Sequence, residues 1–132
     1  MLVVHGLDGQ DEMSVTGPTY MVEIGNDNQL KESIFDPAAC GIDLVSIDEL
    51  KGGNAEENAT IARELLSGDG SSALLDAVAL NAGAALYVYG EVLDISEGYK
   101  RARTAIIDGT TASKLDQIVV ELNLATDDIA VP

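Results

Sequence analysis

An apolar segment in the middle of the chain constrains the fold more than any other feature. A helix over residues 73–92, capped by Ser71 or Ser72, would be apolar nearly all round. Such a helix belongs in a core or an interface, because a surface helix needs a polar face. We expect it to pack against a sheet and neighbouring helices with four residues buried: Leu74, Val78, Leu86 and Val88. Its longest apolar stretch, 77–88, contains Asn81 and is too short to span a membrane, so we expect no membrane segment.

The remaining segments predict a small sheet followed by helices, and thus an α/β chain. Residues 20–24 alternate in the way of a strand; the turn formers of 25–28 and the extended pattern of 29–35 complete a β-hairpin. Asn54, with Glu57 three residues later, predicts a capped helix start. The other expected elements are a buried strand over 2–5, a helical turn begun by Asp36 and Pro37, an irregular or strand segment over 43–50, helices over 54–66, 96–109 (capped by Ser96) and 112–124, and a frayed tail over 125–132.

The charge balance limits what the chain binds. With 23 acidic residues against 7 basic ones, its formal net charge is −16. Such a charge argues against nucleic acid as a partner, because nucleic acid needs a basic surface. It is also unexpected for a protein that binds phosphates unaided. Two explanations stay open, alone or together: basic phosphate-binding residues lie in a missing N-terminal part, or the source organism is salt-adapted.

Composition also narrows the class of protein and its location. Hydrophobic residues make up 46% of the chain, which excludes a disordered protein. We recognise no signal peptide, and the single Cys40 has no partner for an internal disulfide. We therefore expect a cytoplasmic protein with one domain.

Two adjacent carboxylates near the N-terminus are the main candidate site. Asp11 and Glu12 follow an apolar strand and the glycines Gly6 and Gly9. Mg²⁺ binds through one or two carboxylates together with substrate phosphates, so this loop is suited to it. Both carboxylates reach one site only if the backbone turns, which the glycines permit. The competing interpretation is an ordinary solvated acidic loop.

Other chemically active residue types favour structural roles. Residues 49–59 are explained by helix initiation, although the same N–H groups could hold an anion. His5 has no orienting carboxylate in its pattern, and Cys40 has no companion histidine in a motif, so neither is expected to catalyse. Asn81 is expected to be a buried hydrogen-bonding residue or an interface residue.

Four segments, in this order, resemble the C-terminal part of the anthranilate phosphoribosyltransferases. They are residues 5–19 (HGLDGQDEMSVTGPT), 50–59 (LKGGNAEENA), 80–87 (LNAGAALY) and 94–109 (DISEGYKRARTAIIDG). The resemblance covers residues 1–122. It departs from the family's pattern at Gln10 and in the tail after Leu122.

The resemblance implies a fold and an activity. The fold is the C-terminal portion of a nucleoside phosphorylase/phosphoribosyltransferase-type α/β domain, with a β-hairpin and three to four helices. Residues 1–132 would then be a partial catalytic domain that lacks the family's N-terminal helical domain and glycine-rich phosphate-binding loop. In that family the pair matching Asp11 and Glu12 coordinates Mg²⁺ on the pyrophosphate of phosphoribosyl pyrophosphate, and anthranilate accepts the phosphoribosyl group in tryptophan biosynthesis.

Because of these missing parts, we expect the isolated chain to be inactive and its bare apolar surface to favour self-association or poor solubility at low salt. One alternative is a non-catalytic binding or assembly module that kept the fold. A related family, the pyrimidine nucleoside phosphorylases, is a weaker alternative, because its C-terminal pattern is not recognised in this chain.

Overall fold

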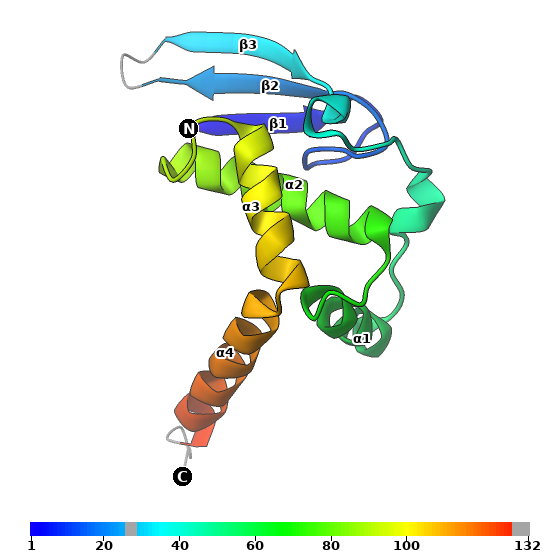
Figure 1. Cartoon of the computed structure of the whole chain (residues 1–132), viewed down its shortest axis with the longest axis vertical. Coiled ribbons are helices and arrows are strands. Elements are labelled where there is room, and N and C mark those ends of the chain that lie inside the picture. The colour runs from blue at the N-terminus through cyan, green and yellow to red at the C-terminus, as the bar shows by residue number, and fades with distance from the viewer. Residues whose placement is uncertain (26–28, 128–132) are drawn as a thin grey trace.

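The computed structural model describes residues 1–25 and 29–127, with the side chains of the last helix described as far as Leu122. Its strands and helices form an α/β arrangement, as the sequence predicts (Figure 1). In chain order they are β1 (Leu2–Gly6), β2 (Thr19–Ile24), β3 (Leu30–Phe35), the 3₁₀ helices η1 (Pro37–Cys40) and η2 (Ile47–Leu50), and the helices α1 (Ala55–Leu66), α2 (Ser72–Tyr89), α3 (Ile95–Ile107) and α4 (Thr110–Asp127).

The three strands form one antiparallel sheet in the order β1-β2-β3. β2 and β3 are the expected hairpin, but residues 26–28 of its expected turn lie outside the described residues. β1 pairs with the other edge of β2, which places Val3 opposite Val22. The prediction of a buried first strand is wrong, because Leu2 and Val4 pack against the core whereas Val3 is 52% exposed. Such alternation is typical of an antiparallel strand that packs on one face.

The core lies between the sheet and the helices α2 and α3. Figure 1 shows α2 running beneath the sheet and α3 crossing α2. The two helices meet at Gly83 and Gly98. A Cβ atom on Gly83 would lie 2.3 Å from the backbone nitrogen of Tyr99, and one on Gly98 would lie 2.3 Å from the carbonyl oxygen of Gly83. The crossing therefore requires two residues without side chains.

The buried side of α2 differs from the predicted one. Leu74 and Leu86 are only half-buried, and Val78 and Val88 are 39% and 50% exposed. The buried residues of the helix are Ala73, Leu75, Ala79, Leu80, Gly83 and Ala84. The helix is apolar on every side, so its composition does not identify the face that α3 covers.

The length of α2 also bears on the expectation that the chain has no membrane segment. Its 18 residues make it the one helix, among the described residues, that is long and apolar enough to cross a membrane. The prediction from the shorter stretch 77–88 is therefore wrong as a length argument. One third of the helix is buried inside the protein, and the test takes account of length and composition alone.

Most helix starts follow the predicted caps. The Asn54 side chain accepts hydrogen bonds from the first turn of α1, and the Ser71 side chain does so for α2. The predicted cap of α3 is wrong: Asp94 accepts from the Glu97 N–H at 2.8 Å, and Ser96 lies inside the first turn. Both residue types favour caps, and an aspartate two residues earlier takes the role.

Other boundaries also differ from the expected ones. Residues 43–46 are irregular, which is one of the two expected forms, but 47–50 form η2, which begins with a capping box of Ser46 and Glu49. Helix α2 ends before the expected Val92, because Gly90 adopts a left-handed conformation with φ of 89°.

Helix α4 is longer than the expected 112–124. It begins at Thr110, and its backbone is helical to Asp127, so residues 125–127 of the expected frayed tail are helical. The rest of that tail, 128–132, lies outside the described residues. Figure 1 shows α4 projecting away from the sheet and the other helices.

Candidate functional site

The loop between β1 and β2, residues 7–18, is called the acid loop here because it carries Asp11 and Glu12. Its first turn is closed by backbone hydrogen bonds from Gly6 N to Gln10 O at 2.8 Å and from Gly9 N to Gly6 O at 2.9 Å. Gly9 has a φ of 98°, and a Cβ atom on Gly6 would lie 2.5 Å from a carboxylate oxygen of Asp8. The glycines therefore permit the turn that the acid pair needs.

Asp8 organises the interior of the acid loop. Its carboxylate accepts hydrogen bonds from the hydroxyls of Ser14 and Thr16 and, at 2.9 Å, from the amide of Gln10. Partial burial acts to raise the pKa of Asp8, but these hydrogen bonds hold it well below its usual range. Asp8 is not among the site residues predicted from the sequence. The nearby hydroxyl residues were a signal, but only the folded loop brings them onto one carboxylate.

Asn81 fastens the acid loop to α2. Its Oδ1 accepts from Met13 N at 2.9 Å, and its Nδ2 donates to Met13 O at 2.9 Å and to Ala77 O at 3.0 Å. Met13 is only 1% exposed. Of the two predicted roles, the structure thus gives Asn81 that of a hydrogen-bonding residue, although it is only half-buried. It fixes the backbone next to Glu12.

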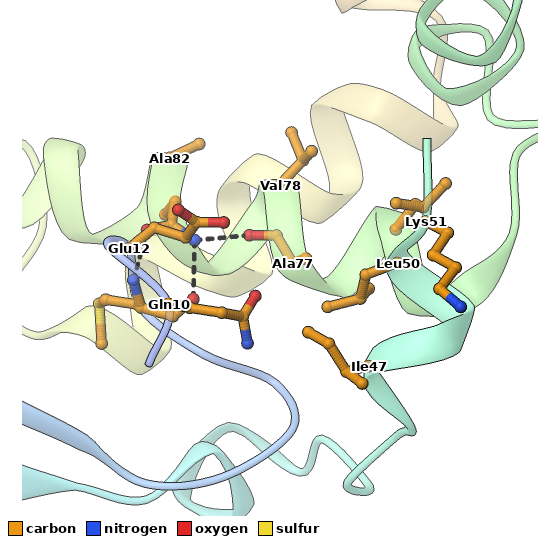
Figure 2. Close-up of a pocket in the computed structure, with 11 residues that line it drawn as sticks. Gln10, Glu12, Ile47, Leu50, Lys51, Ala77, Val78 and Ala82 are labelled. Carbon is orange, nitrogen blue, oxygen red and sulfur yellow. Dashed lines mark hydrogen bonds between the residues drawn. The ribbon is translucent and has the colours of Figure 1, made fainter. Parts of the chain in front are cut away.

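Asp11 and Glu12 are both exposed at the surface of this anchored loop. Glu12 lines a groove of about 730 Å³ between the acid loop, α2 and η2. Figure 2 shows Gln10 and Glu12 on one side of the groove and Ile47, Leu50 and Lys51 on the other. The groove is mostly apolar along α2 and carries one charged side chain of each sign.

By residue type, the adjacent carboxylates of Asp11 and Glu12 fit a hard, partly hydrated cation, although only Glu12 lines the groove. Two exposed carboxylates are the ligands that Mg²⁺ takes from protein, and Mg²⁺ keeps several waters and substrate oxygens. Among the described residues, no group of three or more His, Cys, Asp or Glu side chains gathers as a metal cage. A metal held here would therefore take most of its ligands from water and from a bound phosphate group.

The second sequence segment, 49–59, serves helix initiation, as favoured from its pattern. Asn54 Oδ1 accepts from the N–H groups of Glu56 and Glu57, both at 3.0 Å, and Glu57 Oε2 accepts from Asn54 N at 2.8 Å. The Asn58 side chain bonds both the N–H and the carbonyl of Gly53, at 2.7 and 2.9 Å. These side chains occupy N–H groups that an anion would otherwise use.

His5 and Cys40 lie where a catalytic role is not supported. His5 is exposed on β1. Cys40 is buried, and burial raises the pKa of its thiol, which lowers the fraction of reactive thiolate. Neither residue lines the groove beside Glu12.

Comparison with known proteins supports the resemblance seen in the four motifs. The anthranilate phosphoribosyltransferases of Rubrobacter xylanophilus and Haloarcula marismortui are 42% and 39% identical to the chain over 118 residues, or 89% of its length. The crystal structure of the Thermus thermophilus enzyme matches with a TM-score of 0.83 and 38% identity over 92% of the chain. The Saccharomyces cerevisiae enzyme in complex with PRPP and Mg matches with a TM-score of 0.75 and 25% identity over 87%.

The chain spans about a third of the length of the relatives it matches: 34% and 35% of the two curated enzymes, and 35% and 33% of the two solved chains. A family model described as "Glycosyl transferase family, a/b domain" matches residues 1–112, from β1 to the first turn of α4. The chain therefore belongs to the glycosyl transferase family, as an a/b domain of the type found in anthranilate phosphoribosyltransferases.

Proposed function

We propose that this chain is the part of an anthranilate phosphoribosyltransferase that holds Mg²⁺ and the pyrophosphate end of phosphoribosyl pyrophosphate. Asp11 and Glu12 are the carboxylates that hold the metal. The main observation behind the proposal is that two separate sets of hydrogen bonds hold the loop that bears the exposed acid pair. Asp8 makes one set within the loop, and Asn81 of α2 makes the other. A solvated loop with no function needs no such anchoring, whereas a metal ligand must be held in place.

The charge of the chain supports metal-dependent binding. Its formal net charge is −16, and Lys51 is the only cation among the residues lining the groove. A pyrophosphate would be repelled by this surface unless a divalent cation came between them. A site of this kind binds pyrophosphate together with Mg²⁺ and not alone.

In the proposed reaction the anthranilate amine forms a bond to the anomeric carbon of the ribose while the bond from that carbon to pyrophosphate breaks. When bound, Mg²⁺ supplies charge neutralisation for the leaving pyrophosphate. Asp11 and Glu12 orient the metal-bound group, and positioning supplies much of the rate. No covalent protein nucleophile is needed. The reaction belongs to tryptophan biosynthesis, and we place it in the cytoplasm.

The metal site is testable on the isolated chain. Mn²⁺, a paramagnetic stand-in for Mg²⁺, should broaden the amide NMR signals of Asp11 and Glu12 first, and more strongly with inorganic pyrophosphate present. The double variant Asp11→Asn with Glu12→Gln should abolish this effect. A control variant, Glu56→Gln with Glu57→Gln, removes two charges from another adjacent acid pair and should leave it intact. Equal broadening at both pairs would identify the acid pair as a solvated loop and favour the non-catalytic alternative.

The chemistry is testable by the loss of anthranilate fluorescence. In a complete enzyme containing this segment, the same double variant should weaken Mg²⁺-dependent use of phosphoribosyl pyrophosphate and leave the fold unchanged. The isolated chain, a third of the length of its relatives, should show no useful turnover. Turnover near the ~10 s⁻¹ typical of enzymes would show that it carries a complete active site.

A further inference from the structure

Gln10 lies immediately before the acid pair, and the proposed function gives it no role. It is half-buried on the acid-loop side of the groove (Figure 2). Its Nε2 donates hydrogen bonds to three side chains of the loop, at 2.9 Å to Asp8 Oδ2, at 2.9 Å to Ser14 Oγ and at 3.3 Å to Thr16 Oγ1. An apolar side chain at this position would make none of these bonds.

The main chain of residue 10 is held as firmly as its side chain. Gln10 N donates to Asp8 Oδ1 at 3.2 Å, and Gln10 O accepts from Gly6 N at 2.8 Å. The carboxylate of Asp8 therefore binds both the backbone and the side chain of Gln10. These bonds also fix the orientation of the amide, because in the reversed orientation its oxygen would face the carboxylate, and both groups only accept hydrogen bonds.

The acid pair is consequently held at both ends. Asp11 and Glu12 lie between residues 10 and 13. The N–H and the carbonyl of Met13 are bonded to the Asn81 side chain of α2. The two exposed carboxylates thus belong to a two-residue span whose N-terminal end is fixed by Gln10. Two ligands bind one metal ion more tightly when the backbone that carries them is already in place, because less conformational entropy is lost on binding.

We propose that Gln10 is a positioning residue of the metal site: its amide fixes the N-terminal end of the acid pair through the carboxylate of Asp8. This inference rests on the proposed function, since it requires that Asp11 and Glu12 hold the metal ion. Gln10 acts on the metal through the loop and is not a ligand. Residues that support metal ligands from outside the ligand set typically contribute tenfold or more to metal affinity.

Mn²⁺ titration of the full chain tests the inference, with the paramagnetic broadening of the Asp11 and Glu12 amide NMR signals as the readout. Gln10→Met keeps the length of the side chain and removes its three hydrogen bonds. It should raise the dissociation constant of Mn²⁺ about tenfold. The matched control is Gln117→Met, the same change at an exposed position on α4 (Thr110–Asp127), which should leave the dissociation constant unchanged.

Gln10→Glu separates positioning from simple electrostatics, because the two predict changes of opposite sign. If charge alone mattered, a third carboxylate beside the acid pair would strengthen the binding of a cation. In the positioning role, the new carboxylate replaces the donor that faces Asp8, so the two carboxylates repel each other and the end of the span is released. Mn²⁺ binding should then weaken at least as much as in Gln10→Met. Stronger Mn²⁺ binding by Gln10→Glu would overturn the inference.

A double-mutant cycle tests whether Gln10 acts through Asp8. In the Asp8→Asn background, Gln10→Met should change the dissociation constant by less than about twofold, because the route is already broken. The full tenfold effect in that background would overturn the route through Asp8. Urea unfolding gives the folded fraction of each variant, so that the dissociation constants refer to folded protein.

The outcomes for this inference and for the proposed function are distinguishable. Selective broadening at Asp11 and Glu12 that is equally strong in Gln10→Met would overturn the positioning role and leave the metal site intact. A chain with the natural Gln10 that shows no selective broadening would overturn the proposed function, and this inference with it.

Discussion

Replacement of Asn81 by alanine should release the acid loop from α2 at a large cost in stability. The change removes three hydrogen bonds of 2.9–3.0 Å, two of them to the backbone of Met13. Met13 is 1% exposed, so water does not easily replace the lost partner of its N–H and carbonyl groups. At about 1–3 kcal/mol for each of the two Met13 groups left without a partner, the free energy of unfolding should fall by roughly 2–6 kcal/mol.

Urea unfolding followed by circular dichroism measures this cost. With a slope of about 2 kcal/mol per molar urea, the midpoint should fall by about 1–3 M. The chain offers a matched control in Asn58, whose side chain makes the same reciprocal pair of bonds to Gly53 at an exposed position. Because water replaces exposed bonds readily, Asn58→Ala should cost less than about 1 kcal/mol.

A second readout follows the loop itself. Amide exchange at Met13 should accelerate in Asn81→Ala, whereas exchange within the interior of α3 should change only as global stability does. Asn81→Asp keeps the acceptor for Met13 N–H but turns a carboxylate toward the carbonyls of Met13 and Ala77. It should therefore be destabilising at neutral pH and recover as acid protonates it. Equal costs for Asn81→Ala and Asn58→Ala would refute the anchoring role.

Three further predictions concern the loop carboxylate, the helix crossing and a buried tyrosine. Asp8→Asn should lower the urea midpoint at pH 7; because the pKa of Asp8 is lowered by folding, this difference is present above about pH 4 and should shrink as the pH falls below it. Gly83→Ala should cost roughly 3 kcal/mol in thermal unfolding, because the added Cβ meets the backbone of Tyr99 and of Gly98 at 2.3 and 2.6 Å. Burial, with the hydrogen bond to Asp76, raises the pKa of Tyr99 to about 12. The neutral Tyr99 side chain therefore stabilises the folded state below about pH 10, and this stabilisation is lost as the pH rises toward 12. Tyr99→Phe should reduce that alkaline loss, as followed by urea midpoints at each pH.

The features that the sequence alone determined depend on neighbouring residues. Asn54 with Glu57 predicted the start of α1, and Asp36 with Pro37 predicted η1, because a cap bonds N–H groups only two or three residues away. The alternation of residues 20–24 predicted β2 in the same local way. Ordered motifs around Asp11 and Glu12 identified the family, which the match over residues 1–112 supports.

The features that only the tertiary structure decided depend on residues far apart in the chain. The bond between Asn81 and Met13 spans 68 residues, so no local pattern indicates that the acid loop is anchored there. The apolar surface of α2 does not indicate which face is buried. The close contact of Gly83 with Gly98 determines the buried face and leaves Val78 exposed. Caps and turns form from local hydrogen bonds, whereas the choice of a buried face and the support of a surface loop arise only when distant segments pack together.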